Sequence, residues 1–199
     1  MRLGSVVILN GSTSTDPTPG TSPLSYAWSQ TQGSKVTLNG PNTAKPTFKP
    51  MLPGVYKFSL KVKDGQITSA PATVTITVQD VPIVVFSPNG GEVWKVNTSQ
   101  TIKWYTSKAL VDSHNPVTIK LSQDGGVHWT VIAKEVRNSG TYGWKPGKNN
   151  VTNQARISVC LSDYKKEKHQ QGDDKEAQNG HKKGSGICDG SDANFKIIK

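Results

Sequence analysis

Residues 56–63 read Tyr56-Lys57-Phe58-Ser59-Leu60-Lys61-Val62-Lys63. Apolar and polar side chains alternate along this stretch without interruption, and Asp64-Gly65 follows it as a turn signal. A strand has this period of two when one of its faces is buried and the other meets water. The stretch therefore predicts an amphipathic β-strand in an antiparallel sheet.

Other short apolar or alternating segments lie on both sides of this stretch, separated by turn residues, and none shows a helical period. These strand candidates are residues 6–9, 24–28, 35–38, 47–48, 73–78, 84–86, 100–104, 117–121, 129–132, 140–144, 155–160 and 194–198. The hydrophobic content of 33%, with 19 glycines and 12 prolines, fits the thin cores of small sandwiches. We expect an all-β chain of two tandem immunoglobulin-like antiparallel β-sandwiches.

A domain boundary is predicted at Gln79-Asp80-Val81-Pro82, because a new alternation begins at Ile83. We place the first domain at residues 1–80 and the second at residues 81–199. A linker this short predicts a semi-rigid, elongated tandem.

The net charge of +10 is spread along the chain, and residues 1–80 hold seven basic and three acidic residues. A nucleic-acid binder would instead cluster its basic residues with aromatic ones. We expect a solvated cationic surface and no nucleic-acid partner, with attraction to anionic polysaccharide or a membrane surface as the alternative. No apolar run approaches the ~20 residues of a membrane helix, so we expect no membrane insertion. Met1-Arg2-Leu3-Gly4 does not begin a signal peptide.

The first segment resembles the PKD repeat in its bacterial, chitinase-associated form. The matching residues are Leu9-Asn10-Gly11-Ser12, Asp16-Pro17, Tyr26-Ala27-Trp28, Pro53-Gly54-Val55-Tyr56, Leu60, Val62 and Asp64-Gly65. The resemblance implies an immunoglobulin-like sandwich with Trp28 in its core and Pro53-Gly54 at the entry to a strand. Such repeats usually begin with an extra strand of about ten or more residues, where this chain has only residues 1–5. We expect the first strand to be missing, as in a fragment, or to be supplied in trans at a vacant sheet edge.

The second segment resembles a bacterial extracellular domain related to the yeast Ser/Thr-rich cell-wall proteins, a GPI-anchored family. The matching residues are residues 87–94, 102–104, 121–126, Trp129, 140–144 and 191–195. The resemblance implies a secreted β-sandwich that serves as a surface module without a catalytic role.

Ser122, Asp124, Gly126 and Trp129 satisfy the Asp-box pattern of sialidase propellers. There the Asp and Ser cap a hairpin turn and the Trp packs beneath it. A propeller needs about four or more blades, each with a copy, whereas this chain has one copy. We therefore interpret the motif as a structural, stapled hairpin.

Cys160 and Cys188 are the only cysteines. An even count in a secreted-looking β-protein favours one disulfide, and a metal site would want more ligands. Between them lies a charged insertion, residues 163–186, which contains no Val, Ile, Leu, Phe, Met or Trp and cannot pack a core. We interpret it as a solvated insertion held at its base by the disulfide, or as a recognition loop.

The insertion also holds the residues that a recognition loop would use. These candidate binding residues are Lys165, Lys166, Lys168, His169, His181, Lys182 and Lys183. A metal site of His169 and His181 with Asp173 and Asp174 fits no known spacing. Calcium at Asp16 and Asp64 is the more plausible ion, but two carboxylates fall short of about six to eight oxygen ligands. We therefore expect no cofactor.

No nucleophile elbow, phosphate loop or paired-carboxylate motif is recognisable, so we expect no enzyme. Trp28, Trp104, Trp129 and Trp144 are expected in the cores, while Trp94 is assigned to neither core nor surface. The function we expect is a non-catalytic structural or adhesive module, outside the cell or on its surface, and a candidate fibre component. Its expected partners are other extracellular subunits, cell-surface polysaccharide or further copies of itself. The alternative is an accessory carbohydrate-binding region of a secreted hydrolase.

Overall fold

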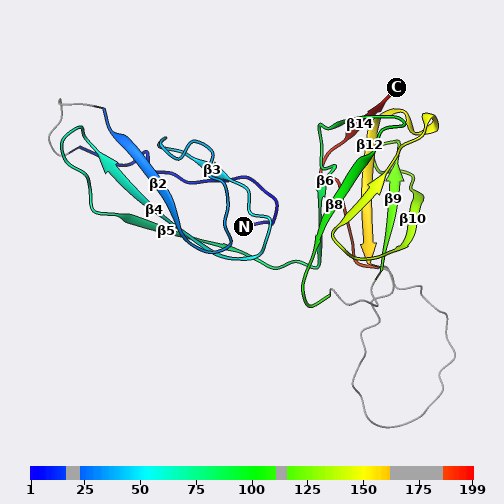
Figure 1. Cartoon of the computed structure of the whole chain (residues 1–199), viewed down its shortest axis with the longest axis horizontal. Helices are drawn as coiled ribbons and strands as arrows, with labels where there is room; N and C mark the ends of the chain where they lie inside the picture. Colours follow the sequence, from blue (N-terminus) through cyan, green and yellow to red (C-terminus); the bar gives the residue numbers. More distant parts are fainter. Residues whose placement is uncertain (17–22, 111–115, 162–185) are drawn as a thin grey trace, which may run out of the picture. The chain divides into compact units, whose positions relative to one another are not determined.

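The computed structural model describes residues 1–16, 23–110, 116–161 and 186–199 (Figure 1). Their regular secondary structure consists of strands and one 3-10 helix, η1 (Lys148–Asn150). The chain divides into two compact units, Met1–Val81 and Pro82–Lys199. The all-β, sandwich-type fold expected from the alternating segments is confirmed.

The first unit contains two sheets. Its strands are β1 (Val7–Ile8), β2 (Ser25–Gln32), β3 (Thr47–Phe48), β4 (Gly54–Lys63) and β5 (Ala72–Val78). One sheet has the order β2-β4-β5, the other pairs β1 with β3, and every pairing is antiparallel. In β4, Tyr56 and Phe58 are buried while Lys57 and Lys61 are exposed, as the alternation predicts.

Aromatic rings from both sheets form the core of the first unit. Phe48 lies with its ring centroid 4.7 Å from that of Phe58 and 5.9 Å from that of Tyr56. Trp28 is buried as expected, and Leu3 is also buried. Burial of these apolar surfaces supplies the main driving force for closing the two sheets on each other.

The second unit also contains two sheets. Its strands are β6 (Ile83–Ser87), β7 (Val93–Lys95), β8 (Gln100–Thr106), β9 (Val117–Ser122), β10 (Thr130–Val136), β11 (Thr141–Trp144), β12 (Thr152–Leu161), β13 (Cys188–Gly190) and β14 (Phe195–Ile198). One sheet has the order β11-β8-β6, and the other the order β10-β9-β12-β14-β7 with β13 beside β12. The β14–β7 pair is parallel, and the others are antiparallel.

Inward-facing side chains of β8, β9, β12 and β14 fill the second core. Ile102, Ile119, Ile157 and Phe195 are completely buried there. Trp94 of β7 joins them, with its ring centroid 4.9 Å from that of Phe195. The residue that the sequence left unassigned is therefore a core residue.

The predicted strand at residues 35–38 is wrong, because these residues form no strand. Instead, the Val36 amide donates to the side chain of Gln30. β7 and β13 were not predicted, since each has only three residues and takes its extended form from its neighbours in the sheet.

Candidate functional site

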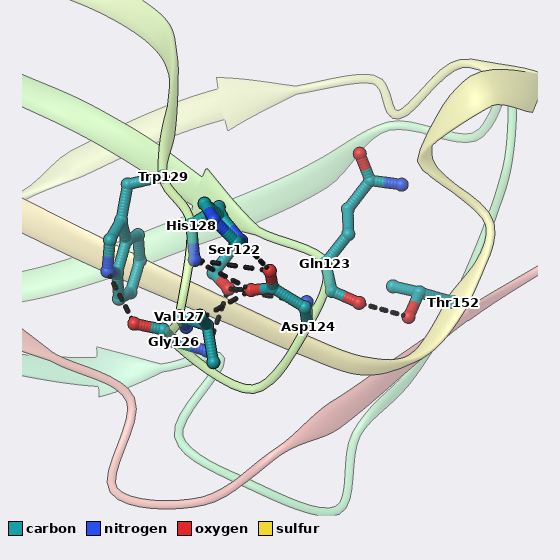
Figure 2. Close-up of polar contacts among 8 residues, drawn as sticks. All are labelled: Ser122, Gln123, Asp124, Gly126, Val127, His128, Trp129 and Thr152. Carbon is teal, nitrogen blue, oxygen red and sulfur yellow. Dashed lines mark hydrogen bonds and ion pairs between the residues drawn. The ribbon is translucent and has the colours of Figure 1, made fainter.

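The Asp-box residues lie together in the turn that joins β9 to β10 (Figure 2). Ser122 ends β9, Asp124 and Gly126 lie in the turn, and Trp129 comes directly before β10. The local sequence thus places a short hydroxyl, a carboxylate and two adjacent glycines between a pair of antiparallel strands.

The Asp124 carboxylate is a shared hydrogen-bond acceptor for several groups of this turn. It accepts hydrogen bonds from the backbone amides of Val127 at 3.1 Å and His128 at 2.9 Å, and from the Ser122 hydroxyl at 2.7 Å. The Ser122 hydroxyl oxygen in turn accepts the Gly126 amide at 2.7 Å. The His128 ring nitrogen Nδ1 lies 2.6 Å from Asp124 Oδ2. One carboxylate and one hydroxyl therefore satisfy the polar backbone groups of a reversing chain.

Two glycines in the turn have backbone angles that other residues rarely adopt. Gly125 has a φ of 76° and Gly126 a φ of 105°. Both values lie where a Cβ atom would be strained, which explains why the motif contains glycine here. The turn is also joined to β12, because the Gly125 amide donates to the Gln154 carbonyl and Thr152 Oγ1 donates to the Gln123 carbonyl.

The hydrogen bonds at the turn lower the pKa of Asp124 well below its usual range. The backbone amide of His128 is the largest cause, followed by the Ser122 hydroxyl and the His128 side chain. Each of these donors favours the ionised carboxylate. The carboxylate therefore serves as a permanent acceptor at neutral pH, and the arrangement is that of a structural staple.

Substituting Asp124→Asn should reduce the amount by which the free energy of unfolding falls in acid. The folded-state pKa of Asp124 is lowered, so its contribution to stability is present above the unfolded-state pKa of about 4 and is lost as pH falls below it. Urea unfolding at pH 7 and pH 3 measures the difference. The wild-type protein should lose more stability between these pH values than the variant. Glu135→Gln, which removes an exposed carboxylate of β10, should behave as wild type; equal acid losses in wild type and Asp124→Asn would contradict the prediction.

Trp129 does not lie in the core as expected from the sequence, and this expectation is wrong. Its side chain is 38% exposed, and its Nε1 donates to the Gly126 carbonyl at 2.9 Å. The indole therefore lies across the turn, where its polar edge has a partner. Trp28, Trp94 and Trp104 are buried, and Trp144 is half-buried against the second core.

A second polar cluster joins the loops between β6 and β7 and between β13 and β14. Asn89 donates through its Nδ2 to Asp192 at 2.8 Å, and the Asp192 amide returns a bond of 2.7 Å to Asn89 Oδ1. Glu92 accepts the amides of Asn89 and Gly90. A Cβ atom on Gly90 would lie 2.7 Å from that of Ala193, so only glycine fits there. Two motifs separated by about a hundred residues thus meet in one structural junction.

Ser191 is the buried centre of this junction. Its hydroxyl donates to the Pro88 carbonyl at 2.6 Å and accepts the Ile157 amide at 3.0 Å. Substituting Ser191→Ala leaves both backbone groups without this partner and should lower the free energy of unfolding of the second unit by about 1–3 kcal/mol. Urea unfolding measures the loss, and the exposed Ser139→Ala should change it by less than about 0.5 kcal/mol. A loss no larger than in this control would contradict the prediction.

Cys160 and Cys188 form a disulfide, as the sequence predicted. They face each other in the register of β12 and β13, with their Cα atoms 4.0 Å apart. The bridge therefore cross-links neighbouring strands.

The candidate calcium residues Asp16 and Asp64 line the same hollow in the first unit, with a volume of about 450 Å³. Asp64 Oδ1 already accepts the amides of Gln66 and Ile67, and the bond from Ile67 is the largest cause of its lowered pKa. Within the described residues, no group of three or more histidine, cysteine or acidic side chains is placed to hold a metal ion. The expectation of no cofactor, with calcium at Asp16 and Asp64 as the candidate ion, stays a prediction.

All seven candidate recognition residues of the insertion fall among residues 162–185, outside the described part of the chain. They are Lys165, Lys166, Lys168, His169, His181, Lys182 and Lys183. Among the residues that the structure does describe, no helix has the length and apolar character to cross a membrane.

The first unit matches a known protein family. Residues 2–78 match the family described as K319L-like, PKD domain. The solution structure of the PKD domain from KIAA 1837 protein is similar at 31% identity, with a TM-score of 0.33, over 39% of this chain and 78% of that one. The family match confirms the PKD resemblance of the first segment.

Two further solved structures are similar. A nucleoside hydrolase-related hypothetical protein from Saccharophagus degradans, associated with carbohydrate metabolism, has 26% identity and a TM-score of 0.35. The match covers 40% of this chain and only 21% of that protein. The fibronectin(III)-like modules of Clostridium thermocellum CbhA have 20% identity and a TM-score of 0.29, over 98% of this chain and 88% of theirs.

A search of curated protein sequences gave no match. The resemblance of the second segment to the yeast cell-wall protein family is not supported by these comparisons. The second unit is an all-β fold with a disulfide, a stapled turn and a polar junction.

Proposed function

We propose that this chain, with a PKD domain at residues 2–78, is a non-catalytic structural or adhesive module of an extracellular or cell-surface protein. The family match of the first unit is the observation that carries the proposal. The Cys160–Cys188 disulfide supports the location, because disulfides persist mainly in oxidising compartments outside the cytosol. Its partners are other extracellular protein subunits or cell-surface polysaccharide, and assembly into a fibre is the most specific form of the proposal.

The polar clusters support a structural role for the second unit. The carboxylates of Asp124 and Glu92 accept hydrogen bonds from backbone amides of their own loops, and the carboxylate of Asp192 accepts one from the side chain of Asn89 in the adjoining loop. Such bonds hold turns in place, and rigid turns at the ends of a sandwich are suited to presenting a fixed surface to a partner.

Antibodies raised against the purified chain test the location on intact cells of the source organism. Surface labelling without permeabilisation is expected, and labelling only after permeabilisation would overturn the proposal. Binding of the purified chain to isolated envelope fractions, before and after protease treatment of those fractions, identifies the partner class. Loss of binding after protease indicates a protein subunit.

The carbohydrate-binding alternative has one observation in its favour, the exposed indole of Trp129. Sugars stack on exposed aromatic rings, and a half-exposed Trp beside a rigid turn offers one such surface. Retention on chitin, cellulose or peptidoglycan that is lost on Trp129→Ala would favour this alternative. Retention that persists in Trp129→Ala would leave the ring without a role in binding.

A further inference from the structure

Among the described residues, no strand lies along the outer edge of β5 in the sheet of the first unit, and the Met1 amino group contacts this edge at Thr77. β5 pairs with β4 along its whole length, from Val78 opposite Gly54 to Ala72 opposite Leu60. The sheet order is β2-β4-β5, so no described strand covers the other side of β5. An edge of this kind exposes a row of backbone donors and acceptors that can template another strand.

The backbone groups on this edge belong to three threonines. The Met1 amino group donates to the Thr77 carbonyl at 3.0 Å, so this carbonyl points away from β4. In an antiparallel strand alternate residues direct their N–H and C=O groups to the same side. The backbone groups of Thr73 and Thr75 therefore point outward with those of Thr77.

β5 lacks the features that usually protect an edge from pairing. Residues 72–78 read Ala-Thr-Val-Thr-Ile-Thr-Val, without a charged residue, a proline or a glycine. Their register with β4 has no bulge. Natural edge strands are commonly blocked by one of these features, and a seven-residue uncharged segment of high β-propensity is prone to pair.

The inward face of β5 is only partly covered. Val74 and Ile76 are half-buried, whereas their partners in β4, Phe58 and Tyr56, are almost completely buried. A further strand beside β5 would bring apolar side chains next to Val74 and Ile76 and remove this surface from water.

We propose that β5 pairs antiparallel with β5 of a second copy of this chain, about a two-fold axis at Thr75. In this register Thr75 lies opposite its own copy and Thr73 lies opposite Thr77. On the other face Val74 lies opposite Ile76, so each threonine faces a threonine and each aliphatic residue faces an aliphatic residue. The three outward threonines form hydrogen-bonded pairs, with about six bonds between the copies. In the dimer, the hydrogen bond from the exposed Met1 amino group to the Thr77 carbonyl is replaced by one from the backbone of the new strand.

Charge opposes this pairing only weakly at physiological salt. Lys57 and Lys61 lie on the exposed face of β4, one strand away from the interface. The two β4 strands of the dimer are three strand spacings apart, about 14 Å. This distance exceeds the Debye length of about 8 Å at 0.15 M salt. Association should therefore strengthen when the ionic strength rises from about 0.01 M to 0.15 M.

This dimer rests on the proposed structural role, because pairing between copies of the chain is one way to assemble a fibre. Surface labelling of cells does not depend on β5, so the two proposals can fail separately. If antibodies label intact cells but the purified chain is monomeric, the structural role stands and the dimer does not. If the chain dimerises but is found only inside cells, the dimer stands and the structural role does not.

Cysteine cross-linking tests the register, because both native cysteines are held in the disulfide. Hydrogen-bonded antiparallel pairs have Cα atoms about 5.5 Å apart, within reach of a disulfide. Under mild oxidation Thr75→Cys should form a covalent dimer. Thr73→Cys should do so only when mixed with Thr77→Cys. Absence of the Thr75→Cys dimer, or self-linking of Thr73→Cys alone, would overturn the proposal.

Sedimentation equilibrium tests the association itself. Thr75→Pro removes an outward N–H that β4 does not use, so the unit should fold while the dimer weakens at least about tenfold. The matched Thr75→Val should dimerise as tightly as wild type. A wild-type protein that is monomeric at every concentration would overturn the proposal. Monomers whose Thr75 amide is protected from hydrogen exchange would further show that another segment of the same chain covers β5.

Discussion

Replacing Cys160 and Cys188 together by alanine is expected to lower the free energy of unfolding of the second unit by about 3.5 kcal/mol. The two cysteines are 28 residues apart in sequence, and closing a loop of this length restricts the unfolded chain. The loss should be visible in urea unfolding followed by tryptophan fluorescence, because four of the five tryptophans lie in the second unit.

Reduction of the wild-type protein provides the control for this experiment. A thiol reductant should lower the stability of wild type by about the same 3.5 kcal/mol and leave the double variant unchanged. The first unit, which contains no cysteine, should be unaffected by either treatment. A double variant within about 0.5 kcal/mol of wild type would contradict the prediction. The size of the loss also indicates how strongly the fold depends on an oxidising environment.

Substituting Phe58→Ala is expected to lower the free energy of unfolding of the first unit by about 3–5 kcal/mol. Phe58 is 0% exposed and its ring lies 4.7 Å from that of Phe48, which belongs to the other sheet. The truncation therefore removes a contact that joins the two layers and leaves a cavity between them. Domains have a free energy of unfolding of about 0.05–0.15 kcal/mol per residue. The total stability of a unit of this size is therefore only slightly larger than the expected loss.

Hydrogen exchange read by mass spectrometry measures this effect, because peptides report on each unit separately. Phe58→Ala should speed exchange across β2, β4 and β5 and leave the second unit unchanged. The matched variant Lys57→Ala changes the next residue on the exposed face of β4 and should cost less than about 0.5 kcal/mol. Equal exchange in the two variants would contradict the prediction.

The regular part of the fold could be predicted because its strands carry their own pattern. The alternation of residues 56–63 lies wholly within β4, and the apolar residues of β9 and β12 likewise mark strands with one buried face. In such segments the local sequence and the buried layer require the same period of two. The disulfide followed from cysteine count and type of protein, which also need no three-dimensional knowledge.

Features that depend on distant partners could not be predicted in this way. β7 and β13 have three residues each, too few for a period to be read. The junction of Asn89 with Asp192 joins residues 103 apart, and only the topology brings them together. Trp129 was expected in the core because it lies on a short predicted strand beside glycine, whereas in the structure its Nε1 donates to the Gly126 carbonyl at the turn.

The parallel pairing of β14 with β7 affects how the protein can be made. β14 lies between β12 and β7 in its sheet, so the strand nearest the end of the second unit occupies an interior position. A ribosome or export channel releases residues 195–198 after the other described strands of the second unit, and until then β7 lacks its partner in this sheet. The first unit draws its contacts from residues 1–81 and can fold much earlier. Synthesis should therefore proceed through a species with one finished domain followed by an open, aggregation-prone one.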